Sequence, residues 1–317
     1  MESFGGYAFA KGHSASYAVE SYQCMFLKTY YPLEYLVAVI NNGGGFYPPE
    51  FYVHETRMKE GVVHAPDINK SEALTTINGK NIYLGFGLMA ELEKNIIENI
   101  LKERYEHGIF KDLTDFLNRV FISADQLTLL IRIGAFNFTG RTKKQLLWHM
   151  YAFLGGKKKS EPEKELFELN KKAYTLPQLE HGKHEDALDE MEILGFPLYS
   201  PFKLIKEKPA IALTAANLPK HHRKVVSILG YLVTVKSTRT IHGDVMGFGT
   251  FLDKEGRFID TTHFPDTMKK FPFMGRGCYL IKGKVAEEFG FYSIEVTEMQ
   301  RLNFVTRLDE ENDEKKL

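Results

Sequence analysis

The stretch VVSILGYLVTV, residues 225–235, is rich in β-branched residues and contains neither proline nor charge. This composition is typical of a β-strand. Comparable runs follow, some separated by the glycine-ended turn signals 254–256 and 288–290. The predicted strands are 225–235, 245–252, 258–262, 277–285 and 291–296, with a short helix at 265–271. Five strands with a helix after the third are the order of an OB-type β-barrel, although other small barrels share the pattern.

The sequence before this run predicts helices. Between Ser14 and Tyr30 apolar residues recur at spacings of three and four, which predicts a helix buried on most sides with Ser14 as its N-cap. A short hairpin is expected around Asn78 and Gly79. The other predicted helices are 33–40, 48–59, 88–106, 112–119, 124–133 and 142–154, and a further helix ends near 194. The fold class is therefore multidomain α+β, with a mostly helical N-terminal half and a C-terminal OB-type β-barrel.

The overall charge of the chain does not by itself indicate a nucleic-acid or membrane partner. Lysine plus arginine and aspartate plus glutamate number 41 each, so any nucleic-acid or membrane site must be local. Cys24 and Cys278 lie far apart, and neighbouring histidines have no companion ligands at suitable spacing, so no metal is assigned. The apolar runs are too short to cross a bilayer and no signal peptide is recognisable. A cytoplasmic location without a membrane partner is expected.

Four passages, in order along the chain, carry a resemblance to one family. They read GGYAFAKGHSASYAVESYQ (5–23), APDINKSE (65–72), LIRIGAFNFTG (130–140) and LGFPLYSPF (194–202). Together they resemble the C-terminal portion of the alpha subunit of bacterial DNA polymerase III, the DnaE or C-family polymerases. Two more passages, NNGGGFYPPEFYVHETRMKEG (41–61) and RTKKQLLWHMYAF (141–153), look more like the error-prone ImuC-type paralogue of damage-induced mutagenesis than like the main replicase.

The resemblance implies how the chain is divided. Residues 1–70 correspond to the end of the polymerase fingers domain, 71–154 to a degenerate helix-hairpin-helix module, 155–208 to a linker with short helices, 209–304 to the OB domain, and 305–317 to a disordered tail. The family's palm, with its metal-binding aspartates, precedes this region, and the chain offers no convincing carboxylate pair of its own. The expected function is DNA synthesis past damage only when the chain is joined to a palm. Mg²⁺ is expected only with that palm, and DNA and dNTP are the partners implied for the joined enzyme.

A nucleotide site is predicted where the first helix begins. Lys11 and His13 stand beside free backbone N–H groups and the positive end of the helix dipole, an arrangement that favours an anion. By resemblance this segment faces the incoming triphosphate, which assigns that role to Lys11 and His13, with Tyr7 and Ser14 as weaker neighbours. Ala10 replaces the asparagine usual in the family. The alternative is that Lys11 is solvated and His13 only caps the helix.

The helix-hairpin-helix module carries an acidic turn. By resemblance, Glu91-Leu92-Glu93 stands where the family has a glycine-rich hairpin whose backbone N–H groups meet phosphate. Carboxylates repel phosphate, and the conformations available to glycine are expected to be lost, so weakened duplex contact is predicted. The alternative DNA-binding residues nearby are Arg141, Lys143 and Lys144.

The OB domain is expected to bind single strands by stacking bases on aromatic side chains within a basic rim. The candidate residues for this rim and its stacking surface are Tyr231, Lys236, Arg239, Phe248, Phe251 and Arg257. Arg239 is the strongest electrostatic candidate, because the passage STRTIHGD (237–244) that contains it is expected to form an exposed loop between the first two strands. The alternative for the aromatic residues is that they fill the barrel core.

The chain carries part of a docking motif near residue 166. Leu166 and Phe167 match only the end of the sliding-clamp peptide of replicative members, so a short amphipathic helix is the preferred interpretation and clamp contact is not expected. Mutagenesis or replisome proteins are the partners implied by the resemblance. A different class of function also fits: a non-catalytic single-stranded nucleic-acid-binding or partner-docking protein that acts through the OB fold.

Overall fold

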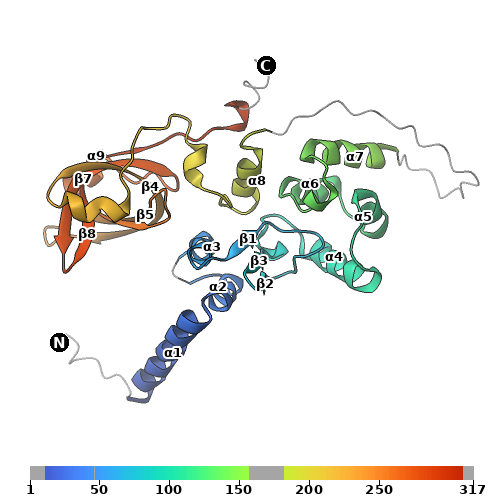
Figure 1. Cartoon of the computed structure of the whole chain (residues 1–317), viewed down its shortest axis with the longest axis horizontal. Coiled ribbons are helices and arrows are strands. Elements are labelled where there is room, and N and C mark those ends of the chain that lie inside the picture. The colour runs from blue at the N-terminus through green and yellow to red at the C-terminus, as the bar shows by residue number, and fades with distance from the viewer. Residues whose placement is uncertain (1–10, 46, 157–181, 310–317) are drawn as a thin grey trace, which may run out of the picture. The chain divides into compact units, whose positions relative to one another are not determined.

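The computed structural model describes residues 11–45, 47–156 and 182–309, and Figure 1 shows their elements. The chain divides into two units. The first holds the described residues up to His64 together with Thr75–Tyr83, and the second holds Ala65–Leu74 and the described residues from Leu84 onward. The five predicted domain ranges stay predictions, because these units follow packing and not the family's boundaries.

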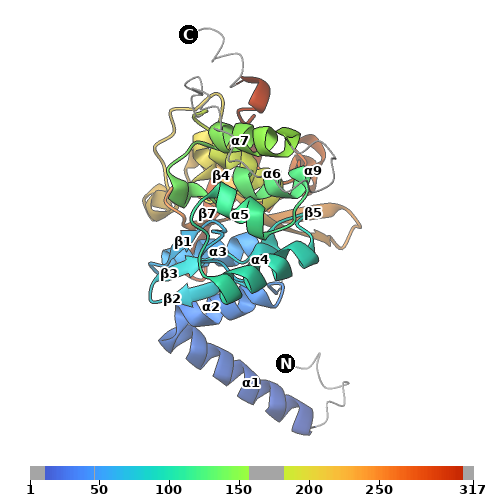
Figure 2. The ribbon, with the colours of Figure 1, turned by 90° about the vertical axis from the view of Figure 1, so that its right-hand side faces the viewer.

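The first unit begins with α1 (Lys11–Tyr30), which differs from the expectation in two ways. The helix starts at Lys11, so Ser14 lies inside it and is not its N-cap. The side chains of residues 12–30 are all exposed, so the predicted burial of this helix is wrong in this structure. Figure 2 shows α1 extending beyond the other elements of its unit.

The rest of the first unit packs two helices with a small sheet. Prolines open α2 (Pro32–Asn41) and α3 (Pro49–Met58), where the missing N–H costs no hydrogen bond. The predicted hairpin is confirmed by the antiparallel pair β2 (Thr76–Asn78) and β3 (Asn81–Tyr83). A further strand, β1 (Val62–His64), runs parallel to β3 on its other side. The buried residues of this unit include Leu36, Ile40, Val53 and Ile82.

The second unit opens with a helical module. Its helices are α4 (Lys94–His107), α5 (Leu113–Arg119), α6 (Ala124–Arg132) and α7 (Lys143–Gly156), with short 3-10 turns at η2 (Phe86–Leu88) and η3 (Asn137–Thr139). Asp112 and Ser123 cap α5 and α6 by accepting from backbone N–H groups. Phe116 packs edge-to-face on Phe110 and on Phe136, with both ring centroids 5.1 Å away. These aromatic residues form the centre of the module.

The barrel follows α8 (Glu185–Ile193), η4 (Pro201–Leu204) and η5 (Ala215–His221). Its elements are β4 (Val225–Arg239), β5 (Val245–Leu252), β6 (Phe258–His263), α9 (Pro265–Lys270), β7 (Cys278–Glu288) and β8 (Phe291–Arg301). The strands close in the order β4-β5-β6-β8-β7, with β6 and β8 parallel and the other pairs antiparallel. This order, with α9 after the third strand, confirms the predicted OB-type barrel.

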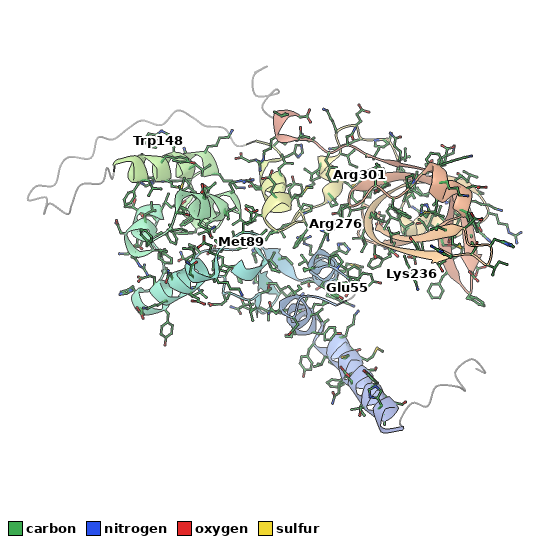
Figure 3. The ribbon with its side chains drawn as sticks, turned by 180° about the vertical axis from the view of Figure 1, so that it is seen from behind. Glu55, Met89, Trp148, Lys236, Arg276 and Arg301 are labelled. Carbon is green, nitrogen blue, oxygen red and sulfur yellow. The ribbon has the colours of Figure 1, made fainter. Side chains whose placement is uncertain are left out.

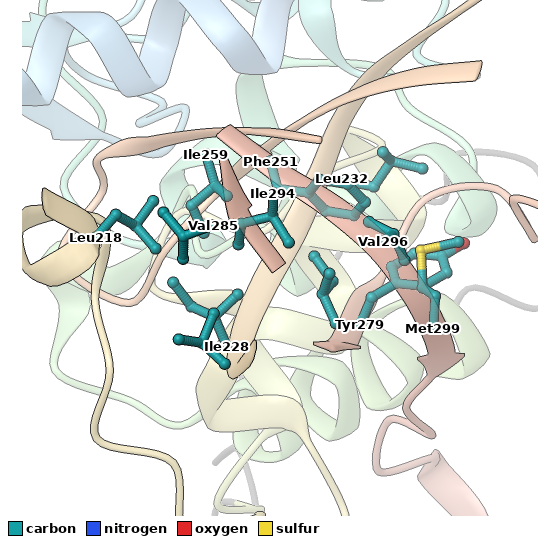
Figure 4. Packing of buried hydrophobic residues seen from close by; sticks show 12 residues of the cluster. Leu218, Ile228, Leu232, Phe251, Ile259, Tyr279, Val285, Ile294, Val296 and Met299 are labelled. Atoms are coloured by element: carbon teal, nitrogen blue, oxygen red, sulfur yellow. The ribbon is translucent and has the colours of Figure 1, made fainter. Parts of the chain in front are cut away.

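The barrel core is filled from every strand. Ile228, Phe251, Ile259, Tyr279 and Ile294 are each buried inside it, as the close view in Figure 4 shows. The interior also includes the segment after α9: a Cβ added at Gly249 would lie 2.8 Å from the ring of Phe273, so only glycine fits there. The inner side of the β4–β5 ribbon is therefore covered, and a ligand would have to meet its outer side.

The segments on either side of the barrel are held together. Ile205 forms a β-bridge with Phe304, and the Val305 N–H donates to the Leu204 carbonyl at 2.8 Å. The predicted disordered tail from 305 is corrected in its first part, because residues 307–309 form a helical turn whose Arg307 is ion-paired. Within the described ranges, no helix is long and apolar enough to cross a membrane.

Candidate nucleic-acid interface

The barrel presents an outer face built from three neighbouring strands. Side chains alternate along each strand, and Ile259 and Thr261 point inward, so Phe258, Asp260 and Thr262 point outward. Phe248 of β5 is paired with Thr262 on one side and with Lys236 of β4 on the other. We call this set the outer face: Lys236, Phe248, Phe258, Asp260 and Thr262.

The outer face combines aromatic rings with a small, mixed charge. Phe248 is 40% exposed, so its ring can accept a base on its exposed side, and Phe258 beside it is 37% exposed. Lys236, labelled in Figure 3, is exposed and has no ion-pair partner among the described residues. Asp260 accepts a hydrogen bond from the Thr250 hydroxyl at 2.9 Å and brings a negative charge to the same surface. The face is therefore better suited to stacking than to attracting phosphate.

Two of the predicted rim cations lie away from this face. Arg239 is paired with Val245, three residues beyond Lys236, and alternation along β4 places it on the opposite side of the ribbon. Arg257 lies in the β5–β6 turn, where its Nε is 3.9 Å from a Glu255 carboxylate oxygen. The structure brings Lys236 and Phe248 together but does not gather the predicted cations into one rim.

Two of the predicted stacking residues are core residues. Phe251 lies in the barrel core. Tyr231 is buried with Ile205 and Cys278 in a second, smaller cluster. Neither ring can accept a base without unfolding the barrel, so these two predictions are wrong.

Two exposed phenylalanines at the β7–β8 hairpin were missed by the sequence analysis. Phe289 and Phe291 are 91% and 80% exposed. Phe289 and Gly290 both have positive φ, 53° and 85°, as in the tight two-residue turns that join the strands of a hairpin. Phe291 lies two residues before Ser293, which pairs with Asp260, so Phe291 points to the same side as the outer face. The sequence signal for this exposed pair is a phenylalanine on each side of the turn glycine, Phe289-Gly290-Phe291.

The acidic turn of the helical module keeps one conformation that glycine would favour. Glu91 has φ of 67°, so the expectation that this conformation would be lost is wrong at Glu91. The buried amide of Gln126 holds the turn: its Nε2 donates to the Glu91 carbonyl and its Oε1 accepts from the Glu93 N–H, both at 2.9 Å. The Ala90 N–H donates to the Ile193 carbonyl at 2.7 Å. Two N–H groups of the turn are thus already used, and both glutamate side chains are exposed.

The three cations proposed near this module have different surroundings. Lys143 is only 5% exposed, and its Nζ lies 2.6 Å from Asp186 and 2.8 Å from Asp189, so it is an internal ion-pair partner and not a DNA contact. Arg141 is exposed and has its Nη1 3.0 Å from the Nδ1 of His149. Lys144 is half-buried. Arg141 is the stronger remaining candidate.

Asp189 is the centre of the ion-pair network that takes up Lys143. Besides Lys143, it accepts from Arg132 Nε and Arg307 Nη2, each at 2.7 Å, and it is 1% exposed. Glu192 pairs with the same two arginines, and the hydrogen bond from Arg307 is the main reason that its pKa lies below the ordinary value. The network joins α6, α7 and α8 to the segment that follows the barrel.

The predicted nucleotide residues lie at the start of α1 or outside the described ranges. Lys11 is the first residue of the helix, and His13 and Ser14 are exposed in its first turn. The His13 ring meets Tyr17 edge-on, with 4.6 Å between centroids. Tyr7, like Leu166 and Phe167, lies outside the described residues. No further group is brought to this turn by the described part of the first unit, so the triphosphate assignment stays a prediction.

One group of potential metal ligands is present among the described residues. Glu103, Glu106 and His107 lie on successive turns of α4, and His107 Nδ1 is 3.1 Å from a Glu103 carboxylate oxygen. Glu103 also faces Arg119, 3.7 Å away, which competes with a cation for the same carboxylate. The group is largely exposed, and we assign it no metal.

The chain is similar to a helix-hairpin-helix family and to DNA polymerase III alpha subunits. A family model described as a helix-hairpin-helix motif matches residues 61–146. The DNA polymerase III subunit alpha of Aquifex aeolicus (strain VF5) is 27% identical over 274 residues, which cover 84% of this chain and 23% of that protein. The protein of the same name from Staphylococcus aureus (strain MRSA252) is 30% identical over 282 residues, covering 84% and 25%. The chain thus spans about a quarter of the length of these relatives.

A comparison of structures matches a smaller part of the chain. The solved structure "OBody AM1L10 bound to hen egg-white lysozyme" shares 20% identity and covers 31% of this chain and 96% of its own, with a TM-score of 0.25. Over most of its length, this chain is similar to DNA polymerase III alpha subunits.

Proposed function

We propose that this chain is part of an error-prone DNA polymerase III alpha subunit and supports DNA synthesis past damage when joined to a palm. Similarity over 84% of the chain to alpha subunits supports the family, and the helix-hairpin-helix match supports a role on DNA. The passages at 41–61 and 141–153 support the error-prone, ImuC-type assignment. Catalytic carboxylates and their Mg²⁺ would come from the palm.

The observation that carries this proposal is the exposure of α1. Among the described residues 12–30, every side chain is exposed, and Figure 3 shows them standing out along the helix. The large apolar side chains exposed on α1 are Tyr17, Val19, Tyr22, Met25, Phe26, Leu27 and Tyr30. A helix that is apolar around much of its circumference is stable in water only when another surface covers it.

The occupant that we propose for α1 is the part of an alpha subunit that lies outside the aligned quarter of the relatives. A fingers region placed there would cover the apolar side chains and bring Lys11, His13, Ser14 and Tyr7 toward the incoming triphosphate. Since the dipole of α1 favours an anion at its first turn, that position suits a phosphate group. The assignment of these four residues rests on the joined enzyme.

The barrel would hold the single-stranded template. Phe248 and Phe291 offer rings on one side of the barrel, and base stacking is worth about 1–3 kcal/mol per base. Lys236 supplies one positive charge there, and Asp260 offsets it. Stacking therefore dominates at this face, and binding there should depend only weakly on salt.

The test is primer extension by this chain with and without a palm-bearing alpha-subunit fragment. The chain alone should extend nothing, and the mixture should extend an undamaged primer and pass a template lesion. Tyr22→Asp with Phe26→Asp should abolish extension by the mixture, because charge on α1 prevents docking. The matched control, Tyr105→Asp, changes an exposed aromatic residue of α4 and should leave extension unchanged. Unaltered extension by the α1 double variant would contradict the proposed docking.

A second candidate function is single-stranded DNA binding without catalysis. The closed barrel, whose flanking segments pair with each other, favours it, because this part needs no palm to be complete. Tight binding of an oligonucleotide by the chain, combined with no stimulation by any palm-bearing fragment, would favour this second function.

A further inference from the structure

The barrel has a polar groove at its neck, where the chain enters and leaves it. The Lys206 N–H donates to the Asn303 carbonyl at 2.9 Å. Two cavities, of about 420 and 550 Å³, lie beside this pair of residues. Both are lined by Lys206, Arg301, Leu302 and Asn303. We call these two cavities the neck groove. None of the nucleotide-binding or DNA-binding residues predicted from the sequence lines this groove.

Arg301 is held in place on the neck groove by the backbone beneath it. Its Nη2 donates to the Arg276 carbonyl at 2.7 Å, and both arginines are labelled in Figure 3. Gly277 has φ of 149°, and a Cβ there would lie 2.8 Å from Arg301 Nε. Only glycine lets the guanidinium lie so close to the chain. A guanidinium has five N–H donors, so this anchoring leaves others free for a ligand.

The charges on the neck groove favour an anion. Lys208 is exposed, and neither it nor Arg301 has an ion-pair partner among the described residues. Lys206 is paired with Asp309 at 2.5 Å, which cancels both charges, and Glu207 adds one negative charge. Two free positive charges thus face one negative charge. In the smaller cavity, Gln300 and Asn303 add neutral hydrogen-bonding side chains, so its lining suits a hydrated, charged ligand better than an apolar one. The larger cavity is also lined by Phe304 and Leu308.

We propose that the neck groove binds backbone phosphates of single-stranded DNA through Lys208 and Arg301. This rests on the proposed DNA-binding function and adds a second contact to it. β8 links the two contacts: it begins at Phe291, beside the outer face, and ends at Arg301. At about 3.3 Å per residue, its 11 residues give a length along the strand of at most about 33 Å. A strand that stacks on the outer face must therefore be long enough to reach the groove as well.

The test is fluorescence anisotropy of the full chain with a labelled oligothymidylate of four nucleotides and with one of twenty-four, across a salt series. Lys208→Glu and Arg301→Gln should each weaken binding of the long oligonucleotide by about 5- to 10-fold at low salt, and lower the slope of log affinity on log salt by about 0.7 per lost phosphate contact. Neither variant should change binding of the short oligonucleotide. The matched control, Lys254→Glu, reverses an exposed lysine in the β5–β6 turn and should change neither.

The outcomes separate the groove from the function on which it rests. If the unaltered chain binds neither oligonucleotide, the proposed DNA-binding function fails. If it binds both, and Lys208→Glu and Arg301→Gln match Lys254→Glu at both lengths, the groove is not a DNA contact. Binding of pyrophosphate or dNTP that depends on Lys208 and displaces the long oligonucleotide would overturn the assignment to the DNA backbone in favour of a free phosphate ligand. Normal thermal melting of Arg301→Gln shows that the barrel remains folded.

Discussion

Arg307 donates a hydrogen bond to Asp189 at 2.7 Å across 118 residues of sequence. Asp189 also neutralises Lys143, which is almost completely buried. One carboxylate thus connects the helical module with the segment that leaves the barrel.

Removing the charge of Asp189 should destabilise this unit strongly. Asp189→Asn leaves Lys143 buried with only the exposed Asp186 as a charged partner, and removing one partner of a buried ion pair typically costs about 3 kcal/mol or more. Urea unfolding followed by circular dichroism measures the free energy of unfolding. Glu192→Gln, which changes a half-exposed carboxylate in the same network, should cost less than about 1 kcal/mol. Equal losses in the two variants would contradict the central role of Asp189.

Acidification should weaken the barrel through His263. The His263 ring is buried against Phe273, its Nε2 is 3.0 Å from the Thr261 hydroxyl, and burial lowers its pKa from 6.5 to about 4. The unfolded chain therefore binds a proton more readily below pH 6.5. Stability should be complete above that pH and fall by about 3 kcal/mol as the pH reaches 4.

The check on His263 is the pH dependence of barrel unfolding in two variants. His263→Phe should flatten the curve between pH 6.5 and 4, because no proton can then be taken up at this position. His242→Phe changes an exposed histidine in the β4–β5 hairpin and should keep the slope. A slope that persists unchanged in His263→Phe would show that another group controls it.

Stacking on the outer face should be measurable one ring at a time. Phe248→Ala and Phe291→Ala should each weaken single-stranded DNA binding by about 1–3 kcal/mol, with little change in salt dependence, because no charge is altered. Anisotropy with a short oligothymidylate gives both quantities. Tyr105→Ala, at an exposed aromatic residue of the helical module, is the control. Full affinity in both phenylalanine variants would remove the outer face as a binding surface.

The acidic turn should gain duplex affinity when its charge is removed. Glu91→Gly with Glu93→Gly deletes two carboxylates beside the N-terminus of α4 and lets residue 91 keep its positive φ without strain. Duplex binding by anisotropy should rise several-fold at low salt. Glu98→Gln, on the exposed side of the same helix, should have a smaller effect. Unchanged duplex binding in the double variant would mean that this turn does not approach DNA.

The barrel could be predicted from the sequence because its signals are local. Strand periodicity and turn glycines define all five strands, and each predicted strand overlaps an observed one. The same periodicity could have corrected part of the site. Phe248 and Phe251 are three residues apart, as are Lys236 and Arg239, and an odd spacing within one strand places two side chains on opposite sides.

Other features depend on partners distant in sequence. The burial of Lys143 follows from Asp189, 46 residues later, and the conformation of Glu91 from Gln126, 35 residues later. The exposure of α1 contradicts its apolar pattern, because periodicity indicates which side of a helix needs cover but not which polypeptide provides it. Sequence patterns therefore predict the helices and strands better than they predict what surrounds each side chain.

The pairing of residues 205 and 206 with 303 and 304 makes the barrel a cassette whose two ends meet at one place. A domain inserted in this manner can be lost, replaced or duplicated without redirecting the chain on either side. Evolution could then retain the helical module as a fixed frame and exchange the barrel for another with a different preference for single strands. Modular exchange of this kind would allow substrate choice to diverge among related chains while their helical scaffold stays the same.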